Sequence, residues 1–179
     1  MHRLASLCLA ATLLTGTAHA DGHDKPDDGA GADARIEIMD TKGETMGSGF
    51  IRRTPSGSVL VTVSATGLTP GWHAVHLHET GTCDPADGFK SAGGHVAEGR
   101  SHGVLSDDGP HPGDLNNQMV YSEGRMVAEM IAPPSLTMEM LSDADGAALI
   151  IHATRDDLKS DPSGEAGGRI ACGVVTPAG

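Results

Sequence analysis

Short runs of alternating apolar and polar residues recur along this 179-residue chain and restrict its fold more than any other feature. Alternation is clearest in residues 34–39 and 58–63, and further strand-like runs occupy residues 124–131, 147–153 and 169–175. Runs of this length, separated by Gly, Pro and Asp turns, are typical of a β-sandwich or β-barrel. Because no segment keeps a helical period for three turns, we predict an all-β domain.

The first twenty residues have the pattern of an export signal. Arg3 provides a positive charge, residues 4–14 are almost entirely apolar, and residues 18–20 form a small-residue cleavage site. The apolar run is shorter than the roughly 20 residues that a membrane-spanning helix needs. We therefore predict a cleaved signal peptide at 1–20, which would send the chain to the periplasm, with release from the cell as the alternative.

Residues 21–32 lack a hydrophobic pattern and are predicted to be a flexible arm, which leaves residues 33–179 as one domain. The arm contains His23, which is more readily explained as a solvated side chain than as a metal ligand. A formal net charge of −12 argues against nucleic acids and anionic membranes as partners. The sequence does not decide between a monomer and a homodimer.

Three cysteines are present, and Cys8 would leave with the signal peptide. Lipid attachment at Cys8 is disfavoured because Leu7, which precedes it, is not a small residue. Cys83 and Cys172 would remain, and an even number of cysteines in an exported chain indicates a disulfide, with two free thiols as the alternative. The bond would close a loop of about 90 residues, worth roughly 4–5 kcal/mol in the chain-entropy model.

Two long segments, residues 79–115 and 154–168, contain Gly, Pro, Asp and His with little apolar content and lack the strand pattern. Long irregular segments in a compact domain are usually functional or disordered. Because these two carry much of the remaining histidine and charge, we interpret them as functional loops.

Seven of the ten histidines gather in three places: a predicted strand at residues 72–78, the loop of residues 79–115, and the end of a later strand at residue 152. Side chains in a strand alternate between its faces, so the core face marked by Val75 and Leu77 also carries His73. His76 and His78 then point away from the core, beneath the long loops, where they can reach a metal ion.

The same alternation in the later strand turns Ile151 inward and His152 outward, so His152 can join the first two if the strands are neighbours. Three imidazoles with open coordination suit copper or zinc. The long loop offers four further nitrogen and oxygen ligands for a tetrahedral zinc site: His95, His102, His111 and Asp114. A solvated polar loop is the alternative, but it does not explain three histidines there.

Two segments resemble the signatures of copper,zinc superoxide dismutases. Residues 71–79, Gly-Trp-His-Ala-Val-His-Leu-His-Glu, are similar to the copper-binding signature, and residues 168–174, Gly-Arg-Ile-Ala-Cys-Gly-Val, to the second one. Residues 91–95, 102–103 and 109–114 resemble the zinc loop of the family. Residues 156–159 together with 162–164 resemble the bacterial form of its active-site loop. The resemblance covers about residues 33–177.

The resemblance implies an eight-stranded antiparallel Greek-key β-barrel or sandwich that binds one copper and one zinc ion per subunit. The implied copper ligands are His76, His78, His95 and His152. The implied zinc ligands are His95, His102, His111 and Asp114. His95 would therefore bridge the two metals.

The resemblance also implies an activity, the conversion of superoxide to oxygen and hydrogen peroxide. Arg169 would attract the substrate anion beside the copper, and we suggest Lys159 as a helper. Asp156 would link the two metal sites through ligands such as His78 and His102. Further implied roles are hydrogen bonding inside the barrel for His73 and a loop-tethering disulfide for Cys83 and Cys172.

Three positions depart from the family pattern: Ala74 where Gly is usual, Thr82 where Asp is common, and Glu165 where bacterial members often have Asn. The methyl group of Ala74 would lie on the copper side, and Glu165 would add negative charge near the substrate channel. None of the three removes a metal ligand, so we expect them to affect the catalytic rate more than the presence of activity.

Three other functions are weighed against this one. A zinc hydrolase with three histidine ligands would leave Arg169 and the second ligand set without a role. A non-enzymatic periplasmic copper-binding or copper-carrier protein would normally offer accessible thiols or a methionine-rich surface, whereas the methionines here are scattered. An inactive structural homologue is disfavoured by the complete ligand set.

Overall fold

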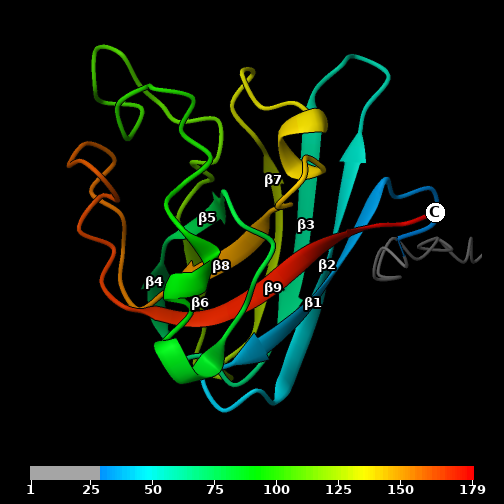
Figure 1. The fold of residues 1–179 in the computed structure, drawn as a ribbon. Coiled ribbons are helices and arrows are strands. Elements are labelled where there is room, and N and C mark those ends of the chain that lie inside the picture. Colours follow the sequence, from blue (N-terminus) through cyan, green and yellow to red (C-terminus); the bar gives the residue numbers. More distant parts are fainter. Residues whose placement is uncertain (1–28) are drawn as a thin grey trace, which may run out of the picture.

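A curled antiparallel sheet with two long loops beside it makes up the computed structural model, which describes residues 29–179 (Figure 1). Its strands are β1 (Ala34–Asp40), β2 (Thr45–Arg53), β3 (Val59–Ala65), β4 (Gly71–His73), β5 (Val75–His78), β6 (Gln118–Val120), β7 (Met126–Ile131), β8 (Ala148–His152) and β9 (Arg169–Pro177). Three single 3-10 turns accompany them: η1 (Pro85–Asp87), η2 (Lys90–Ala92) and η3 (Glu139–Leu141).

Strand order departs from chain order, as a Greek-key connection requires. Seven strands follow the order β5-β8-β9-β1-β2-β3-β7, and β4 pairs with β6. β4 and β5 are interrupted only by the buried Ala74, whose main chain bonds to His152 N–H and to Thr154 O at 2.9 Å each. The prediction of an all-β Greek-key domain is confirmed, with β4 and β5 forming one broken strand of the eight expected.

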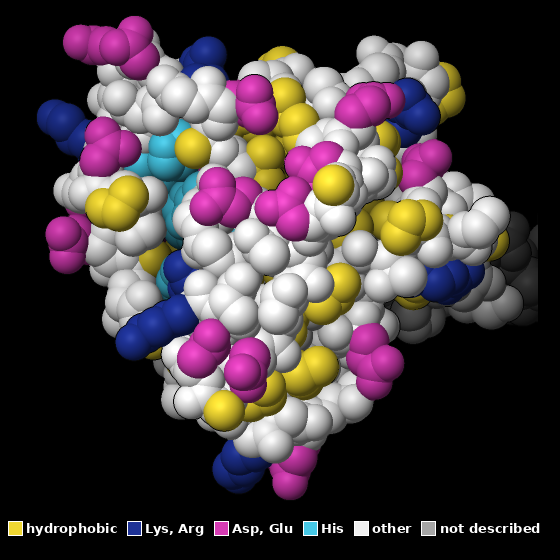
Figure 2. All heavy atoms as spheres, viewed as in Figure 1, with side chains coloured by type: hydrophobic (Ala, Val, Ile, Leu, Met, Phe, Trp, Pro, Cys, Tyr) yellow, Lys and Arg dark blue, Asp and Glu magenta, His cyan; other side chains and the backbone are white. Residues whose placement is uncertain are grey.

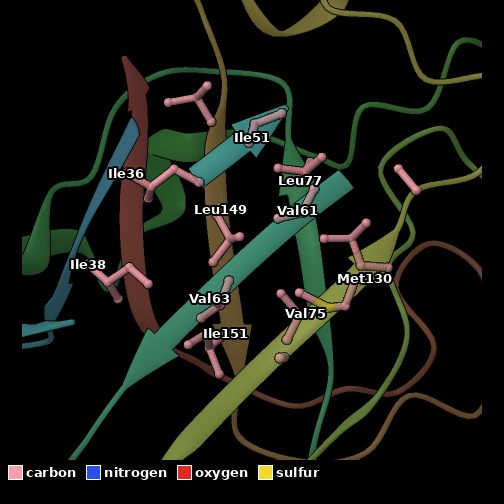
Figure 3. Close-up of a cluster of buried hydrophobic side chains, with 14 of the residues drawn as sticks. Ile36, Ile38, Ile51, Val61, Val63, Val75, Leu77, Met130, Leu149 and Ile151 are labelled. Carbon is pink, nitrogen blue, oxygen red and sulfur yellow. The ribbon is translucent and has the colours of Figure 1, made fainter. Parts of the chain in front are cut away.

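The core lies on the concave side of the sheet and follows the alternation in the sequence (Figure 3). Ile36 and Ile38 of β1 are buried, whereas Arg35 and Glu37, which alternate with them, are exposed. The inward residues of the neighbouring strands complete one apolar cluster: Val61, Val63, Val75, Leu77, Met130, Leu149 and Ile151. Burial of this cluster is the main favourable contribution to folding.

Two strands were not predicted. β2 contains Gly47 and Gly49, which hide its alternation, and β6 is only three residues long. Gly49 is required by packing, because a Cβ there would lie 2.8 Å from the Thr62 carbonyl oxygen of the neighbouring strand. A glycine inside a strand often marks this kind of close approach.

The described part of the predicted arm, residues 29–32, forms a turn beside β2. Ala32 N–H donates to Gly29 O at 3.1 Å, and Arg52 Nη2 donates to Ala30 O at 2.9 Å. The predicted signal peptide, Cys8, His23 and the rest of the arm lie outside the described residues. Within the described range, no helix is long and apolar enough to cross a membrane.

A disulfide joins Cys83 to Cys172, with their Cα atoms 5.7 Å apart, which confirms the predicted bond and excludes the free-thiol alternative. It ties the loop of residues 79–115 to β9 across 89 positions of sequence. The loop that carries four of the candidate ligands is therefore covalently fixed to the sheet.

Candidate metal centre

The free edge of β5 brings the ligands of the long loop next to those of the strand. Leu77 N–H donates to Gly113 O at 2.8 Å, and Leu77 O accepts from Val96 N–H at 2.9 Å. These bonds form isolated bridges that set His78 opposite His95 and His76 opposite Asp114. On its other edge β5 pairs with β8, and β8 ends at His152. Seven candidate ligands from separate segments therefore meet at one place.

The first cluster consists of four buried histidines: His76, His78, His95 and His152. Their potential ligand atoms all lie within 4.8 Å of one another. Ring centroids are 4.1 Å apart for His76 and His95, and 4.8 Å apart for His76 and His152. Rings from both the sheet and the loop thus face one small volume.

Each ring of this first cluster is held through one nitrogen and offers the other. Nε2 of His76 bonds to Asp156, Nδ1 of His78 to Gly93 O and Nδ1 of His95 to Asp114, at 2.8 to 3.0 Å. The opposite nitrogens are buried without a hydrogen-bond partner among the described residues: His76 Nδ1, His78 Nε2, His95 Nε2 and His152 Nε2.

A buried polar atom without a partner costs about 1–3 kcal/mol, so four together need an explanation. One cation coordinated by all four nitrogens would provide it. Neutral imidazoles suit copper and zinc among the transition metals. The donor set of the first cluster therefore fits a copper ion.

The second cluster combines three histidines with one carboxylate and shares His95 with the first. Oδ1 of Asp114 lies 2.9 Å from His95 Nδ1, 3.0 Å from His102 Nδ1 and 3.2 Å from His111 Nδ1. The other carboxylate oxygen accepts Gly103 N–H at 2.8 Å, which fixes its orientation. Three imidazoles and one carboxylate around a buried point fit a tetrahedral zinc ion.

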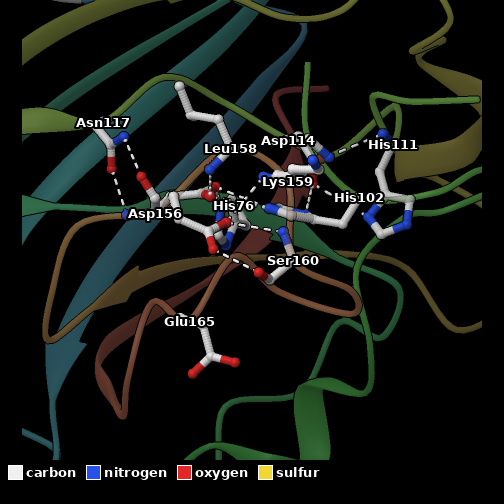
Figure 4. Close-up of polar contacts among 12 residues, drawn as sticks. His76, His102, His111, Asp114, Asn117, Asp156, Leu158, Lys159, Ser160 and Glu165 are labelled. Atoms are coloured by element: carbon white, nitrogen blue, oxygen red, sulfur yellow. Dashed lines mark hydrogen bonds and ion pairs between the residues drawn. The ribbon is translucent and has the colours of Figure 1, made fainter. Parts of the chain in front are cut away.

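Asp156 connects the two clusters (Figure 4). Its Oδ2 lies 2.8 Å from His76 Nε2, and its Oδ1 lies 3.0 Å from His102 Nε2. The expectation that His78 takes part was wrong, because Nδ1 of His78 already bonds to the main chain of the long loop, to Gly93 O. His76 is the ring that faces the loop of residues 154–168.

Burial keeps three histidines of the first cluster, His78, His95 and His152, neutral. It lowers the pKa of His78 to about 2, of His152 to about 3 and of His95 to about 4, and the neighbouring imidazoles add to the effect. For His102, burial acts in the same direction but is outweighed by Asp114 and Asp156, and the pKa rises to about 9. Neutral imidazole is the form that binds metals.

Both aspartates remain ionised. Burial favours their protonated forms, but hydrogen bonds outweigh it: those from His102 and His95 at Asp114, and those from His102 and His76 at Asp156. The pKa values of both carboxyl groups therefore stay well below their usual range. The ionised carboxylates of Asp114 and Asp156 then place two negative charges next to the ligand histidines, which favours the binding of cations there.

Arg169 lies beside the first cluster at the start of β9, where it pairs with His152. Its Nη1 donates to Phe89 O at 2.6 Å and its Nη2 to Gly93 O at 2.7 Å, so the half-buried guanidinium is held by the long loop. Figure 2 shows histidine side chains reaching the surface in a recess between the two long loops, with basic side chains next to them.

Three further residues were singled out in the sequence: His73, Lys159 and Glu165. His73 faces the core, with its ring nitrogens 2.7 Å from His152 O and 2.8 Å from Thr69 O. Lys159 is exposed, and Glu165 is an exposed residue that points away from Asp156 in Figure 4.

Two residues at the site were missed from sequence. Gly164 packs directly onto the Asp156 carboxylate, and Asn117 bonds to the Asp156 main chain. The sequence signals were the place of Gly164 in the segment that resembles the active-site loop and the position of Asn117 three residues after Asp114.

A β-barrel that joins two ligand clusters through one histidine defines a protein with a two-metal centre. Residues 46–175 match the family model described as copper/zinc superoxide dismutase. The chain belongs to this family, whose activity is superoxide dismutation and whose metals are one copper and one zinc ion.

Bacterial relatives agree with this assignment. The chain is 44% identical over 140 residues to the Cu-Zn superoxide dismutase of Caulobacter vibrioides, covering 74% of this chain and 79% of that protein. It is 42% identical over 149 residues to Cu-Zn superoxide dismutase 2 of Aquifex aeolicus, covering 79% and 85%.

Solved structures with the same fold include two bacterial proteins. A SOD-like protein from Bacillus subtilis has a TM-score of 0.73 at 32% identity, covering 78% of this chain and 96% of that one. Cu/Zn superoxide dismutase from Brucella abortus has a TM-score of 0.65 at 27% identity, covering 78% and 97%.

Proposed function

We propose that this superoxide dismutase holds copper through its first cluster and zinc through its second. The copper ligands are His76, His78, His95 and His152. The zinc ligands are His95, His102, His111 and Asp114. The observation that carries this assignment is the orientation of His95, whose Nε2 is unpartnered in the first cluster while its Nδ1 lies 2.9 Å from Asp114 in the second.

The reaction joins two superoxide anions and two protons to give one oxygen and one hydrogen peroxide. Bound copper supplies the one-electron exchange, and bound zinc is redox-inert and stabilises the loop. His95 Nε2 is the atom that we assign to hold a proton for the departing peroxide. Bound zinc would occupy Nδ1 of His95, which would leave Nε2, on the copper side, as the ring nitrogen able to carry the proton.

Arg169 is assigned to bind the anion. A chain of net charge −12 repels superoxide at long range, so attraction must come from a local positive group in the recess. The two carbonyl oxygens that hold the guanidinium do not neutralise it. Lys159, exposed on the neighbouring loop, is assigned as a weaker contributor.

Export to the periplasm, through cleavage of residues 1–20, would place the enzyme against extracytoplasmic superoxide. The substrate is a small anion, and we propose a monomer or homodimer that binds neither nucleic acid nor membrane.

A copper carrier is the second candidate and has less support. Cys83 and Cys172 are joined to each other, and Met126 and Met130 are buried in the core. The two thiols are therefore oxidised and the two thioethers are buried, so none of these four residues offers the soft ligand that a carrier would use for copper(I).

The test is reconstitution of the protein without residues 1–20, followed by stopped-flow measurement of superoxide decay. The expected result is catalysis that requires copper, is lost in His152→Ala, and leaves zinc bound in that variant. Copper binding with no increase over the uncatalysed decay would support the carrier and contradict the proposal.

A further inference from the structure

Asn117 belongs to the segment that follows the zinc loop, but its side chain bonds to the other long loop. Nδ2 of Asn117 donates to Asp156 O at 3.0 Å, and Asp156 N–H donates to Asn117 Oδ1 at 2.8 Å (Figure 4). The amide thereby reproduces the pair of bonds that two facing residues exchange between antiparallel strands. Both main-chain polar groups of Asp156 are held by one side chain.

The position of Asp156 matters to both clusters, because its carboxylate bonds to one ring in each. His76 offers Nδ1 to the first cluster while its Nε2 bonds to Asp156, and His102 uses its two nitrogens in the same way toward the second. Carboxylates that bond to the far nitrogen of a ligating histidine set the orientation of the ring.

The main chain around Asp156 is conformationally demanding and needs to be held. Leu158 has a φ of +67°, which is unfavourable for a residue with a branched side chain, and its N–H donates to Asp156 Oδ1 at 2.6 Å. Gly164 also packs against the carboxylate, where a Cβ would overlap it. Without the two Asn117 bonds, the main chain at Asp156 would be held less firmly, and the carboxylate could move away from the two histidines.

We propose that Asn117 is a positioning residue that orients His76 and His102 through Asp156 and so couples the copper site to the zinc site. This inference rests on the metal assignment proposed above. Both hydrogen bonds of the Asn117 side chain go to the main chain of Asp156, so we expect its effect on the metals to pass through the Asp156 carboxylate.

The experiment compares Asn117→Ala with Asn116→Ala, which removes the exposed amide next to it. Zinc dissociation constants are measured by chelator competition, and copper(II) EPR spectra are recorded with zinc bound. We expect about tenfold weaker zinc binding in Asn117→Ala and an altered copper hyperfine pattern. Asn116→Ala should match the wild type in both. Wild-type zinc affinity and an unchanged EPR spectrum in Asn117→Ala would overturn the inference.

A double-mutant cycle with Asp156→Ala separates positioning from general stabilisation. If Asn117 acts through the carboxylate, Asn117→Ala leaves zinc affinity unchanged in the Asp156→Ala background. The same tenfold loss in both backgrounds would contradict the inference. If Asn117→Ala does not fold, Asn117→Ser carries the same comparison. Failure of the wild type to bind one zinc per chain would instead refute the metal assignment.

Discussion

Replacing Gly164 with alanine tests how closely the loop of residues 154–168 is fitted to the metal ligands. The φ of Gly164 is +65°, and a Cβ built there would overlap the Asp156 carboxylate and lie 2.6 Å from His102 Nε2. Either the loop or the carboxylate must move. Because the Asp156 carboxylate packs between Gly164 and the rings of His76 and His102, we expect it to lose its hydrogen bond to at least one of these rings.

The magnitude has two parts. An alanine at this φ costs about 1–2 kcal/mol from backbone conformation alone. Loss of one hydrogen bond to a charged group adds about 1.5–3 kcal/mol. Gly164→Ala should therefore destabilise the metal-free protein by about 3–5 kcal/mol. Zinc binding should weaken by about 10–100-fold, as is usual when the partner of a ligating histidine is displaced.

Gly57→Ala is the matched control, because Gly57 has a φ of +88° and a Cβ there would meet no atom within 4 Å. It carries the conformational cost without the crowding. Guanidinium chloride unfolding gives the stabilities, and chelator competition gives the zinc affinities. Equal destabilisation of the two variants, with wild-type zinc affinity in Gly164→Ala, would refute the fit described here.

Three further predictions concern substrate attraction, the disulfide and pH. Arg169→Ala should lower the second-order rate of superoxide decay and flatten its fall with salt, since it removes the local positive charge; an unchanged rate and salt slope would exclude the role. Cys83→Ser should lower the free energy of unfolding by about 4–5 kcal/mol in denaturant titrations, because the bond spans 89 positions; a loss below about 1 kcal/mol would contradict this. The metal-free protein should lose stability below pH 6.5, because His78, His95 and His152 have lowered pKa values when folded and the unfolded chain binds protons first. The free energy of unfolding should then fall by up to about 4 kcal/mol per pH unit, because three histidines titrate together. A free energy of unfolding that stays constant from pH 7 to pH 5 in urea titrations would contradict this prediction.

The strands that could be predicted are those whose alternation the core enforces. In β1, Ile36 and Ile38 face inward because the period of a strand is two, and the same rule turns Leu77 inward and His76 outward. β2 escaped prediction because Gly47 and Gly49 carry no side chain to mark a face. The residues that let strands approach closely are therefore the ones that weaken the sequence pattern.

Candidate ligands were found from residue type and spacing, but the contacts between loops were not. Alternation assigns His76 and His78 to one face and does not say which loop covers each ring. The loop that covers each ring is determined by how the edge of β5 hydrogen-bonds to the loop of residues 79–115. As a result, His78 bonds to Gly93 O and His76 bonds to Asp156. Asn117 was missed for the same reason, because loop contacts depend on tertiary packing.

The proposed two-metal centre requires two metal ions that share the imidazole of His95. A crystal structure of the copper- and zinc-loaded protein, with anomalous scattering recorded at both absorption edges, tests this most directly. We predict copper next to His95 Nε2 and zinc next to His95 Nδ1, at about 2.0–2.1 Å for the zinc bond. If only one of the two metals contacted His95 in the oxidised protein, the proposed shared imidazole would be contradicted.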